Sequence, residues 1–287
     1  MVEPVRADLS GKTCVVTGAS SGIGLAAARG LARLRARVVL AVRSAERGEA
    51  ARRAIASATG SAAVEVALVD LSSRGSIHAF AQELARRQPR VDALVNNAGV
   101  WLSRRQRSVD GIELTWATNV LGCLLATQAL LPLLEAAGRA RVVNVASQLA
   151  GGLDLTDVQY ERRPYDGRQA YAQSKQAERM LSWALARRLA ERGVSVNAMH
   201  PGFVATGIFR KGGGLVGLAA SLYAKLRART PDEGADTVVY LAASPDVEGR
   251  SGLFWVDRQE HRCRFRDEAQ EEALYRLCDE MTGGGRS

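Results

Sequence analysis

The stretch Thr17-Gly-Ala-Ser-Ser-Gly-Ile-Gly24 closes an apolar run at 13–18 and opens onto a helix-prone segment, Leu25 to Arg35. A short strand, a glycine-rich turn and a helix in this order are typical of a dinucleotide site. Glycines let the backbone approach a pyrophosphate, and the helix N-terminus offers free N–H groups and the positive end of its dipole. The spacing is G-x-x-x-G-x-G instead of G-x-G-x-x-G, so an ordinary glycine turn is the alternative. Its place in the first strand–helix unit favours phosphate binding.

The next apolar run, residues 37–42, ends at Arg43-Ser44 and indicates which dinucleotide binds. An acidic residue about 20 positions beyond the glycines would hold a ribose 2′-hydroxyl and select NAD. No Asp or Glu stands between this run and Glu46, and a guanidinium suits a 2′-phosphate. We therefore predict NADP(H); the alternative is that Arg43 is one more surface arginine.

Two further predicted strands end in polar residues that would face the ligand crevice. The run at 64–70 ends at Asp70-Leu71, where the carboxylate could hydrogen-bond an adenine amino group. The run at 91–95 leads into Asn96-Asn-Ala-Gly99, whose amides would brace the sheet while the small residues let a ribose lie close. A simple Asn-Gly-type turn is the alternative.

Tyr171 and Lys175 stand four residues apart in a helical pattern that extends to about 192. This spacing puts both side chains on one helix face, one turn apart. A nearby ammonium favours the phenolate form of a tyrosine, so the pair can serve as an acid/base device. The pattern Tyr-x-x-x-Lys is common by chance, and its neighbours decide its meaning. Ser147, after the strand predicted at 141–146, would bring a second hydroxyl to the same oxygen.

The remaining patterns predict a long helix over about 109–137, further helices, and a last strand over 253–256. Asn119 lies in the middle of the long helix. Asparagine competes there for backbone hydrogen bonds, so it needs a reason, either structural bonding or a bound water. The other predicted helices cover about 73–88, 231–244 and 266–281.

Composition limits the class of protein. The 287 residues are 47% hydrophobic, which is enough for a sizeable core in one or two domains. No run approaches the ~18 apolar residues of a membrane span, and the first ten residues carry no apolar signal region. The four cysteines stand far apart without a C-x-x-C pair, which indicates reduced thiols rather than disulfides or a metal site. We expect a cytoplasmic protein with no membrane span.

The net charge of +9 comes almost entirely from arginine. A nucleic-acid or anionic-membrane surface is one interpretation. However, the arginines form short clusters spread along the whole chain, and no basic stripe alternates with aromatic residues. We therefore favour solvated helix faces and expect no nucleic-acid partner.

Taken in order, these residues resemble the short-chain dehydrogenase/reductase family. Each motif is weak or moderate alone, but their joint order over about residues 12–206 is very specific. The retinol-dehydrogenase-like branch is the most similar, on Arg43, the stretch 141–147, and Thr230-Pro-x-x-Gly-Ala235. The matching positions are Thr17-Gly-x-x-x-Gly-x-Gly24, Asp70, Asn96-Asn-Ala-Gly99, Asn119, Ser147, Tyr171-x-x-x-Lys175 and Pro201-Gly202.

The resemblance implies a single-domain Rossmann fold over 1–287, with a doubly wound, mostly parallel seven-stranded sheet flanked by helices. It implies that Tyr171 is the general acid/base, that Lys175 assists it and bonds the nicotinamide ribose, and that Ser147 holds the substrate oxygen. Asn119 would support a water that links Lys175 to solvent. Homodimers or homotetramers, formed through the helices near 109–137 and 168–192, are common in the family.

The resemblance also implies a full set of cofactor contacts. Besides Tyr171 and Lys175, the implied residues line the pyrophosphate, meet the 2′-phosphate, flank the adenine and ribose, or border the nicotinamide. They are Gly18, Ser20, Ile23, Gly24, Arg43, Ser44, Asp70, Leu71, Asn97, Ala98, Gly99, Pro201, Gly202 and Thr206.

Two segments are expected to shape the substrate site. The polar connection at 148–170 would border the cleft, since loops often carry function. The segment 203–228 holds Gly212-Gly-Gly214 before an amphipathic stretch, which suggests a substrate lid, with a surface helix as the alternative. The apolar residues of this stretch favour a bulky apolar substrate. A charged helical tail over 258–287 would cap the lid or form a subunit contact.

We therefore predict an NADPH-dependent oxidoreductase that reduces a polyketide-like ketone or a retinal-like aldehyde to the alcohol. One alternative is a non-catalytic NADP(H)-binding regulatory or scaffold protein, which would have no need of all four catalytic residues. A lyase or epimerase that uses the same Tyr–Lys pair is the other.

Overall fold

The computed structural model describes residues 3–204 and 229–283. Thr206, most of the segment predicted as a lid, and its amphipathic stretch lie outside the described residues. Among the residues that are described, no helix is both long enough and apolar enough to cross a membrane. All four cysteines are free.

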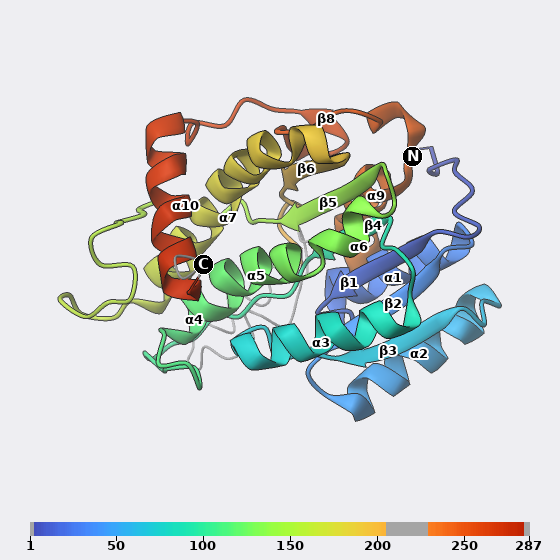
Figure 1. Ribbon diagram of the computed structural model, residues 1–287, viewed down its shortest axis with the longest axis horizontal. Coiled ribbons are helices and arrows are strands. Elements are labelled where there is room, and N and C mark those ends of the chain that lie inside the picture. Colours follow the sequence, from blue (N-terminus) through green and yellow to red (C-terminus); the bar gives the residue numbers. More distant parts are fainter. Residues whose placement is uncertain (1–2, 205–228, 284–287) are drawn as a thin grey trace.

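One mixed sheet forms the centre of the molecule (Figure 1). Its strand order is β3-β2-β1-β4-β5-β6-β7-β8, and β1 to β7 pair in parallel. The chain builds outward from β1 to β3 and then crosses to β4, so β1 and β4 flank the point where the direction reverses. Ligands bind at such a point in open α/β sheets. The strands are β1 Thr13–Thr17, β2 Arg37–Val42, β3 Val64–Leu68, β4 Ala93–Asn96, β5 Ala140–Val145, β6 Val194–Met199, β7 Phe254–Val256 and β8 Gln259–Glu260.

The predicted doubly wound, mostly parallel α/β fold is confirmed, but the sheet has eight strands instead of seven. The additional strand, β8, pairs antiparallel with β7 across a tight turn at Asp257 and Arg258. Both turn residues have positive φ, 50° and 61°, as two-residue hairpin turns require. A two-residue strand is too short to leave a periodic pattern in the sequence.

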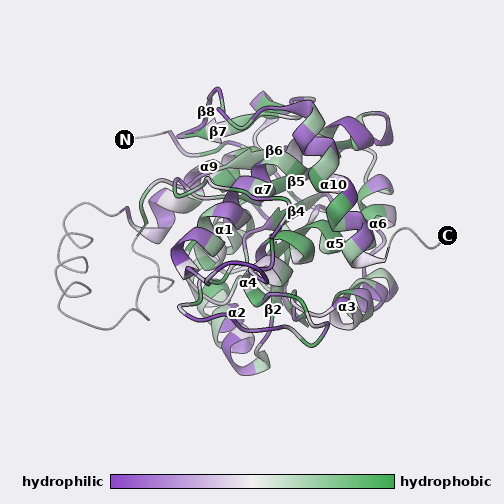
Figure 2. Cartoon of the chain, turned by 90° about the vertical axis from the view of Figure 1, so that its left-hand side faces the viewer, coloured by the Kyte–Doolittle hydropathy of each residue, from purple (hydrophilic) through white to green (hydrophobic). Residues whose placement is uncertain are grey.

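Helices cover both faces of the sheet (Figure 2). One apolar core lies under α1, α2 and α9, and the other lies under α3, α5, α7 and α10. The central strands are almost wholly buried, because a parallel sheet covered on both sides has no solvent-facing side. The helices are α1 Gly22–Arg33, α2 Ala45–Thr59, α3 Arg74–Arg87, α4 Leu114–Trp116, α5 Gly122–Ala129, α6 Leu131–Glu135, α7 Gly167–Leu189, α9 Pro231–Ala243 and α10 Glu268–Thr282, with short helical turns at Ala117–Leu121, Ala190–Arg192 and Pro245–Val247.

The segment predicted as one long helix over about 109–137 is divided into several pieces. Glu113 starts α4 by accepting hydrogen bonds from the backbone N–H groups of Thr115 and Trp116. A π-helical turn, Ala117–Leu121, joins α4 to α5, and Pro132 lies in the first turn of α6. Proline has no N–H to donate to the preceding turn, so the sequence could have indicated that break.

The C-terminal helix α10 packs against α7 in the same chain, as the red and yellow ribbons show in Figure 1. Leu274 and Cys278 of α10 are fully buried, and Arg187 of α7 forms ion pairs with Glu271 and Glu272. Within the segment 258–287 predicted as a helical tail, the helix covers Glu268–Thr282 and docks on one of the helices expected to form a subunit interface. A homodimer or homotetramer stays a prediction.

We expect Leu274→Ala to lower the free energy of unfolding by about 2–5 kcal/mol, because it leaves a cavity where α10 meets α7. Urea unfolding followed by circular dichroism measures the loss. Val109→Ala is the matched control, since Val109 is 84% exposed and its truncation should change stability by less than about 0.5 kcal/mol. Equal losses in both variants would contradict a structural role for the α10–α7 contact.

Candidate active site

A cleft of about 1320 Å³ lies at the carboxyl ends of the parallel strands. Its walls come from the turns that follow β1, β2, β4 and β5, from the start of α7, and from residues after β6. This is the position at which an open α/β sheet binds its ligand. The cleft is larger than the roughly 300–1,000 Å³ of most small-molecule pockets.

The glycine-rich turn packs closely against the turn after β4, where a side chain on Gly18 or Gly24 would not fit. Gly18 has φ of 66°, and a Cβ there would lie 2.9 Å from the Cα of Ala98. A Cβ on Gly24 would lie 2.4 Å from Asn97 Nδ2. Ser21, at the N-cap of α1, makes no side-chain capping bond, so the first N–H groups of this helix remain available to an anion. The turn therefore fits a pyrophosphate.

Thr17 joins the glycine turn to the turn after β4. Its Oγ1 accepts hydrogen bonds from the backbone N–H groups of Asn97 at 2.9 Å and Ala98 at 3.0 Å. In return, Asn97 Nδ2 donates to the Thr17 carbonyl at 2.9 Å. The Asn97 amide thus braces the sheet edge, as the sequence led us to expect.

Arg43 and Ser44 follow β2 directly, and Arg47 lies in the first turn of α2. Arg43 is exposed at the rim of the cleft, and Ser44 caps α2 by accepting a 3.3 Å bond from the backbone N–H of Arg47. The Arg47 guanidinium reaches back to Ser21 Oγ at 3.4 Å, so it lies between the glycine turn and β2. In the described part of the chain neither arginine is paired with a carboxylate. This corner suits a phosphate, which arginine binds through several parallel hydrogen bonds.

Asp70 and its neighbours form the wall beyond β3. Asp70 Oδ1 accepts bonds from the backbone N–H of Ser72 at 2.9 Å and from its hydroxyl at 2.7 Å. The carboxylate is therefore held in one orientation at the cleft wall, as a residue that flanks an adenine requires.

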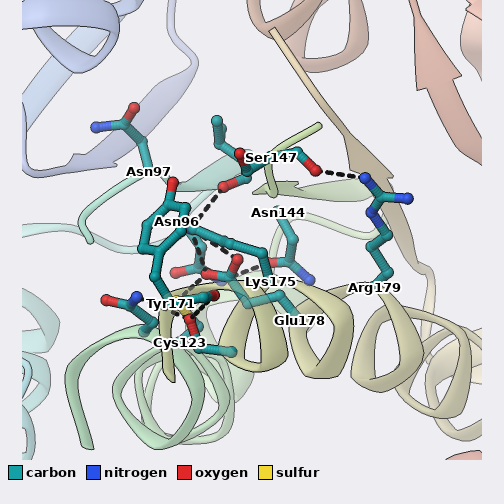
Figure 3. A network of polar contacts seen from close by, with 12 residues as sticks. Asn96, Asn97, Cys123, Asn144, Ser147, Tyr171, Lys175, Glu178 and Arg179 are labelled. Carbon is teal, nitrogen blue, oxygen red and sulfur yellow. Dashed lines mark hydrogen bonds and ion pairs between the residues drawn. The ribbon is translucent and has the colours of Figure 1, made fainter. Parts of the chain in front are cut away.

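Tyr171 and Lys175 project from α7 toward the end of β5, where Ser147 lies (Figure 3). Asp166 starts this helix by capping the backbone N–H groups of Arg168 and Gln169. Tyr171 is only 5% exposed, and its ring stacks on Trp101 with centroids 5.2 Å apart. The phenol is thus fixed on the cleft wall by packing on one side and by the helix on the other.

The Lys175 ammonium is buried and bonded to the end of β5 and to the next turn of α7. Its Nζ donates to the Val145 carbonyl at 3.1 Å and lies 2.7 Å from a carboxylate oxygen of Glu178. Burial lowers the pKa of Lys175, but the charges of Glu178 and Tyr171 more than offset burial, so the pKa stands above its usual value. Lys175 is therefore a cation at neutral pH, as the assistance of a phenolate requires.

Asn119 lies in the π-helical turn, directly behind Gly99. Its Oδ1 accepts from the Val100 N–H at 2.8 Å, and its Nδ2 donates to Ser174 Oγ at 2.9 Å and to the Val100 carbonyl at 3.1 Å. The amide thus fastens the turn after β4 to α7, which is the structural bonding that its mid-helix position indicated. A π-helical turn is a frequent feature of functional sites.

Ser147 follows β5 and is held from two directions. Its Oγ accepts a 3.1 Å bond from the backbone N–H of Leu149, and its carbonyl accepts from the guanidinium of Arg179. Arg179 is buried against the Phe254 ring, 4.2 Å from its centroid. The hydroxyl proton of Ser147 remains free to donate toward the cleft.

Most of the residues expected at the site line this one cleft. Gly24 and Asn119 instead lie behind its wall, where they support the glycine turn and Gly99. Thr206 is outside the described residues. The predicted residues on the cleft wall are Gly18, Ser20, Ile23, Arg43, Ser44, Asp70, Leu71, Asn97, Ala98, Gly99, Ser147, Tyr171, Lys175, Pro201 and Gly202.

Sequence reasoning missed four residues of this region: Arg47, Trp101, Glu178 and Arg179. Helical spacing could have found two of them, since Arg47 lies one turn beyond Ser44 and Glu178 one turn beyond Lys175. Trp101 left no periodic signal because it stands in a loop. Arg179 could not be distinguished from the many other arginines of the chain.

Known proteins share this fold and these motifs. The model of the family described as short chain dehydrogenase matches residues 12–213, and the chain belongs to that family. It falls in the retinol-dehydrogenase-like branch. Retinol dehydrogenase 14 of Mus musculus is 37% identical over 96% of this chain and 87% of its own length. Polyprenol dehydrogenase of Mus musculus is 36% identical over 98% of this chain and 87% of its own length.

A solved structure extends the comparison to the cofactor. The complex of RhlG from Pseudomonas aeruginosa with NADP superimposes with a TM-score of 0.70 at 29% sequence identity, over 88% of this chain and 96% of that one. Together these likenesses make the chain an NAD(P)(H)-dependent oxidoreductase acting on alcohol and carbonyl groups.

Proposed function

We propose that this protein uses NADPH to reduce a ketone or an aldehyde of a bulky apolar substrate to the alcohol. The observation that carries the proposal is that Tyr171, Lys175 and Ser147 share one cleft with the glycine turn. A cofactor bound along that turn would extend toward the Tyr171 phenol. The polyketide-like ketone and the retinal-like aldehyde both remain candidate substrates.

The proton in the proposed reaction comes from Tyr171. NADPH supplies the hydride when it is bound. Ser147 donates a hydrogen bond to the carbonyl oxygen, and Tyr171 gives that oxygen its proton as the hydride reaches the carbon. The Lys175 ammonium stabilises the phenolate that remains and bonds the nicotinamide ribose. Asn119 supports the water through which the proton is replaced from solvent.

The preference for the phosphorylated cofactor is proposed to come from the corner after β2. Arg43, Ser44 and Arg47 provide two cations and a hydroxyl for a 2′-phosphate, and the NADP complex of RhlG supports this choice. Asp70 and Leu71 would flank the adenine. Pro201, Gly202 and Thr206 would border the nicotinamide.

Besides the polar Gln106, Gln148 and Arg168, the cleft has a group of large apolar side chains. Trp101, Leu102, Leu114, Leu149 and Phe203 line it. Such a wall gains affinity by burying apolar surface, and the gain increases with the size of the substrate. The similarity to retinol dehydrogenase 14 and polyprenol dehydrogenase supports a bulky apolar alcohol as product.

A screen of carbonyl compounds tests the proposed function. Purified protein is supplied with NADPH and, in turn, aromatic polyketides, steroids, retinal and aliphatic aldehydes, and oxidation of the cofactor is followed by absorbance. We expect turnover with bulky apolar carbonyls. With deuterium at the transferred position of NADPH, net label in the alcohol supports reduction. Label that stays in recycled cofactor would point to epimerisation.

Trp101 is expected to select for bulky substrates. Trp101→Ala removes the ring that stacks on Tyr171 and should raise KM for a large apolar carbonyl by roughly 3–10-fold, the worth of an aromatic contact. Trp101→Phe keeps an aromatic ring and should retain most of the affinity. Steady-state kinetics with a short aliphatic aldehyde provide the control, because that substrate cannot cover the ring. An equal change for both substrates would argue against the selective role.

A further inference from the structure

Glu178 is a buried carboxylate placed directly behind the catalytic lysine. It stands at the third position after Lys175 on α7, and its two oxygens lie 2.7 and 3.0 Å from Lys175 Nζ. The side chains are 4% and 2% exposed for Lys175 and Glu178, respectively. Tyr171, Lys175 and Glu178 thus form one row on the same helix face, and the carboxylate lies at the end away from the cleft (Figure 3).

Almost no solvent reaches the Glu178 carboxylate, so water screens its charge very little. A small cavity of about 10 Å³ adjoins the carboxylate, at the lower limit of the space that one water needs. Charges in such an interior act more strongly than charges in contact with solvent. The cavity is lined mainly by apolar side chains, namely Val120, Leu124, Leu181 and Leu185, together with Cys123 and Asn144.

Three groups act electrostatically on Glu178, namely Cys123, Lys175 and Arg179. From α5, the Cys123 thiol lies 3.7 Å from Glu178 Oε1, and burial raises the pKa of that thiol so far that it stays neutral. From α7 itself, Lys175 and the neighbouring Arg179 carry positive charge. Burial raises the pKa of Glu178 to about 7, against the opposing effect of Lys175. Burial thus opposes ionisation of the carboxyl, while its contact with the Lys175 ammonium favours the charged form.

The negative charge of Glu178 changes how strongly Lys175 stabilises the Tyr171 phenolate. The ammonium stabilises the Tyr171 phenolate because it is positive, and a carboxylate in contact with it partly cancels that field. The ammonium has three hydrogens, and the bonds to Glu178 and Val145 fix its direction. Glu178 thus both orients the lysine and weakens its pull on the phenol.

We propose that Glu178 is a positioning residue that holds Lys175 in place and, through its negative charge, sets the pH range over which Tyr171 exchanges its proton. The proposal rests on the proposed function, because it assigns the proton to Tyr171. A purely structural ion pair is the alternative, since breaking a buried pair destabilises a protein wherever the pair lies.

The test follows oxidation of the alcohol found in the carbonyl screen, with NADP⁺ and across pH. Oxidation requires the phenolate, so its rate rises with pH along one limb. In Glu178→Gln no carboxylate opposes the positive field of Lys175, so the Tyr171 phenolate is stabilised more strongly. We therefore expect the rising limb of the oxidation rate to move about one pH unit lower. Glu178→Asp keeps the charge and should keep the limb near that of the wild type. An unmoved limb, or one that moves to higher pH, overturns the proposal.

Glu271→Gln is the matched control for a broken buried ion pair. Glu271 is 1% exposed and pairs with Arg187 at the α10–α7 contact, away from the cleft. We expect it to lower the melting temperature without moving the limb, and a limb that moves in this variant also would assign the shift to lost stability. If Glu178→Gln does not fold, Glu178→Met replaces it, because an apolar side chain of similar size is better tolerated in such a site.

A titration without substrate separates this inference from the proposed function. The ultraviolet absorbance of tyrosinate is followed with pH in the wild type and in Glu178→Gln, each minus its Tyr171→Phe counterpart, so that only Tyr171 contributes. Ionisation at lower pH in Glu178→Gln supports the role of Glu178 even if no carbonyl in the screen is reduced. Coincident titrations overturn it, even if the wild type is an active reductase.

Discussion

Tyr171→Phe is expected to lower kcat for carbonyl reduction on the order of 10²–10⁴-fold, the usual contribution of a positioned general acid. The variant removes the only atom that Tyr171 offers to the reaction and keeps the ring that stacks on Trp101. The shape of the cleft and the position of Lys175 should therefore be preserved. NADPH binding, measured by quenching of protein fluorescence, should stay within a few-fold of the wild-type value.

Tyr160→Phe is the matched control for this substitution. The Tyr160 hydroxyl is buried, and the structure gives it no hydrogen-bond partner, so its removal disturbs no bond to another described residue. We expect turnover close to that of the wild type. Near-normal turnover in Tyr171→Phe as well would mean that another group supplies the proton, and the proposed mechanism would be wrong.

Arg43→Asp is expected to reverse the cofactor preference. A hydrogen bond between charged groups is worth about 1.5–3 kcal/mol, so loss of the Arg43 guanidinium should weaken NADPH binding by roughly 10–100-fold. The new carboxylate would repel the 2′-phosphate and could accept a bond from the 2′-hydroxyl of NADH, whose binding should improve. The ratio of kcat/KM for the two cofactors measures the change.

Arg47 makes this prediction sharper. It lies one helical turn beyond Ser44, and its guanidinium lies near Ser21, so Arg47→Ala should weaken NADPH binding without improving NADH binding. Arg86→Asp, on the exposed surface of α3, makes the same change in net charge and should leave both cofactors unaffected. An unchanged preference in Arg43→Asp would remove the basis for assigning NADPH.

The parts of the fold that the sequence predicts well are those whose signal is local. A buried strand, a glycine turn and a helix start each depend on neighbouring residues, so the cradle at Thr17–Gly24 and the pair Tyr171 and Lys175 could be found directly. Long-range packing is different. The start of α4 depends on Glu113, which is bonded by Gln159 and Tyr165 from a distant segment, and β8 depends on β7 being held against β6.

In the candidate site, too, residues within local motifs were predicted and residues placed by long-range contacts were not. Gly24 lies in the first turn of α1, where a Cβ would meet Asn97 and Gly18, and its contact with a cofactor stays a prediction. The four residues that line or support the cleft without having been foreseen carry no motif of their own. Trp101 and Arg179 belong to the site because they contact residues far away in the sequence. Trp101 stacks on Tyr171, and Arg179 donates to the Ser147 carbonyl. Such long-range contacts depend on tertiary structure and leave no pattern in one stretch of sequence.

The docking of α10 on α7 has a consequence for the order in which the enzyme matures on the ribosome. Synthesis proceeds from the N-terminus, and segments begin to fold as they emerge. The glycine turn opens onto α1, which packs against α9 and so lacks this partner until Pro231–Ala243 has been made. The helix that carries Tyr171 and Lys175 lacks its last packing partner until Glu268–Thr282 has been made. Both walls of the cleft therefore gain their full packing only after the C-terminal helices α9 and α10 have been synthesised.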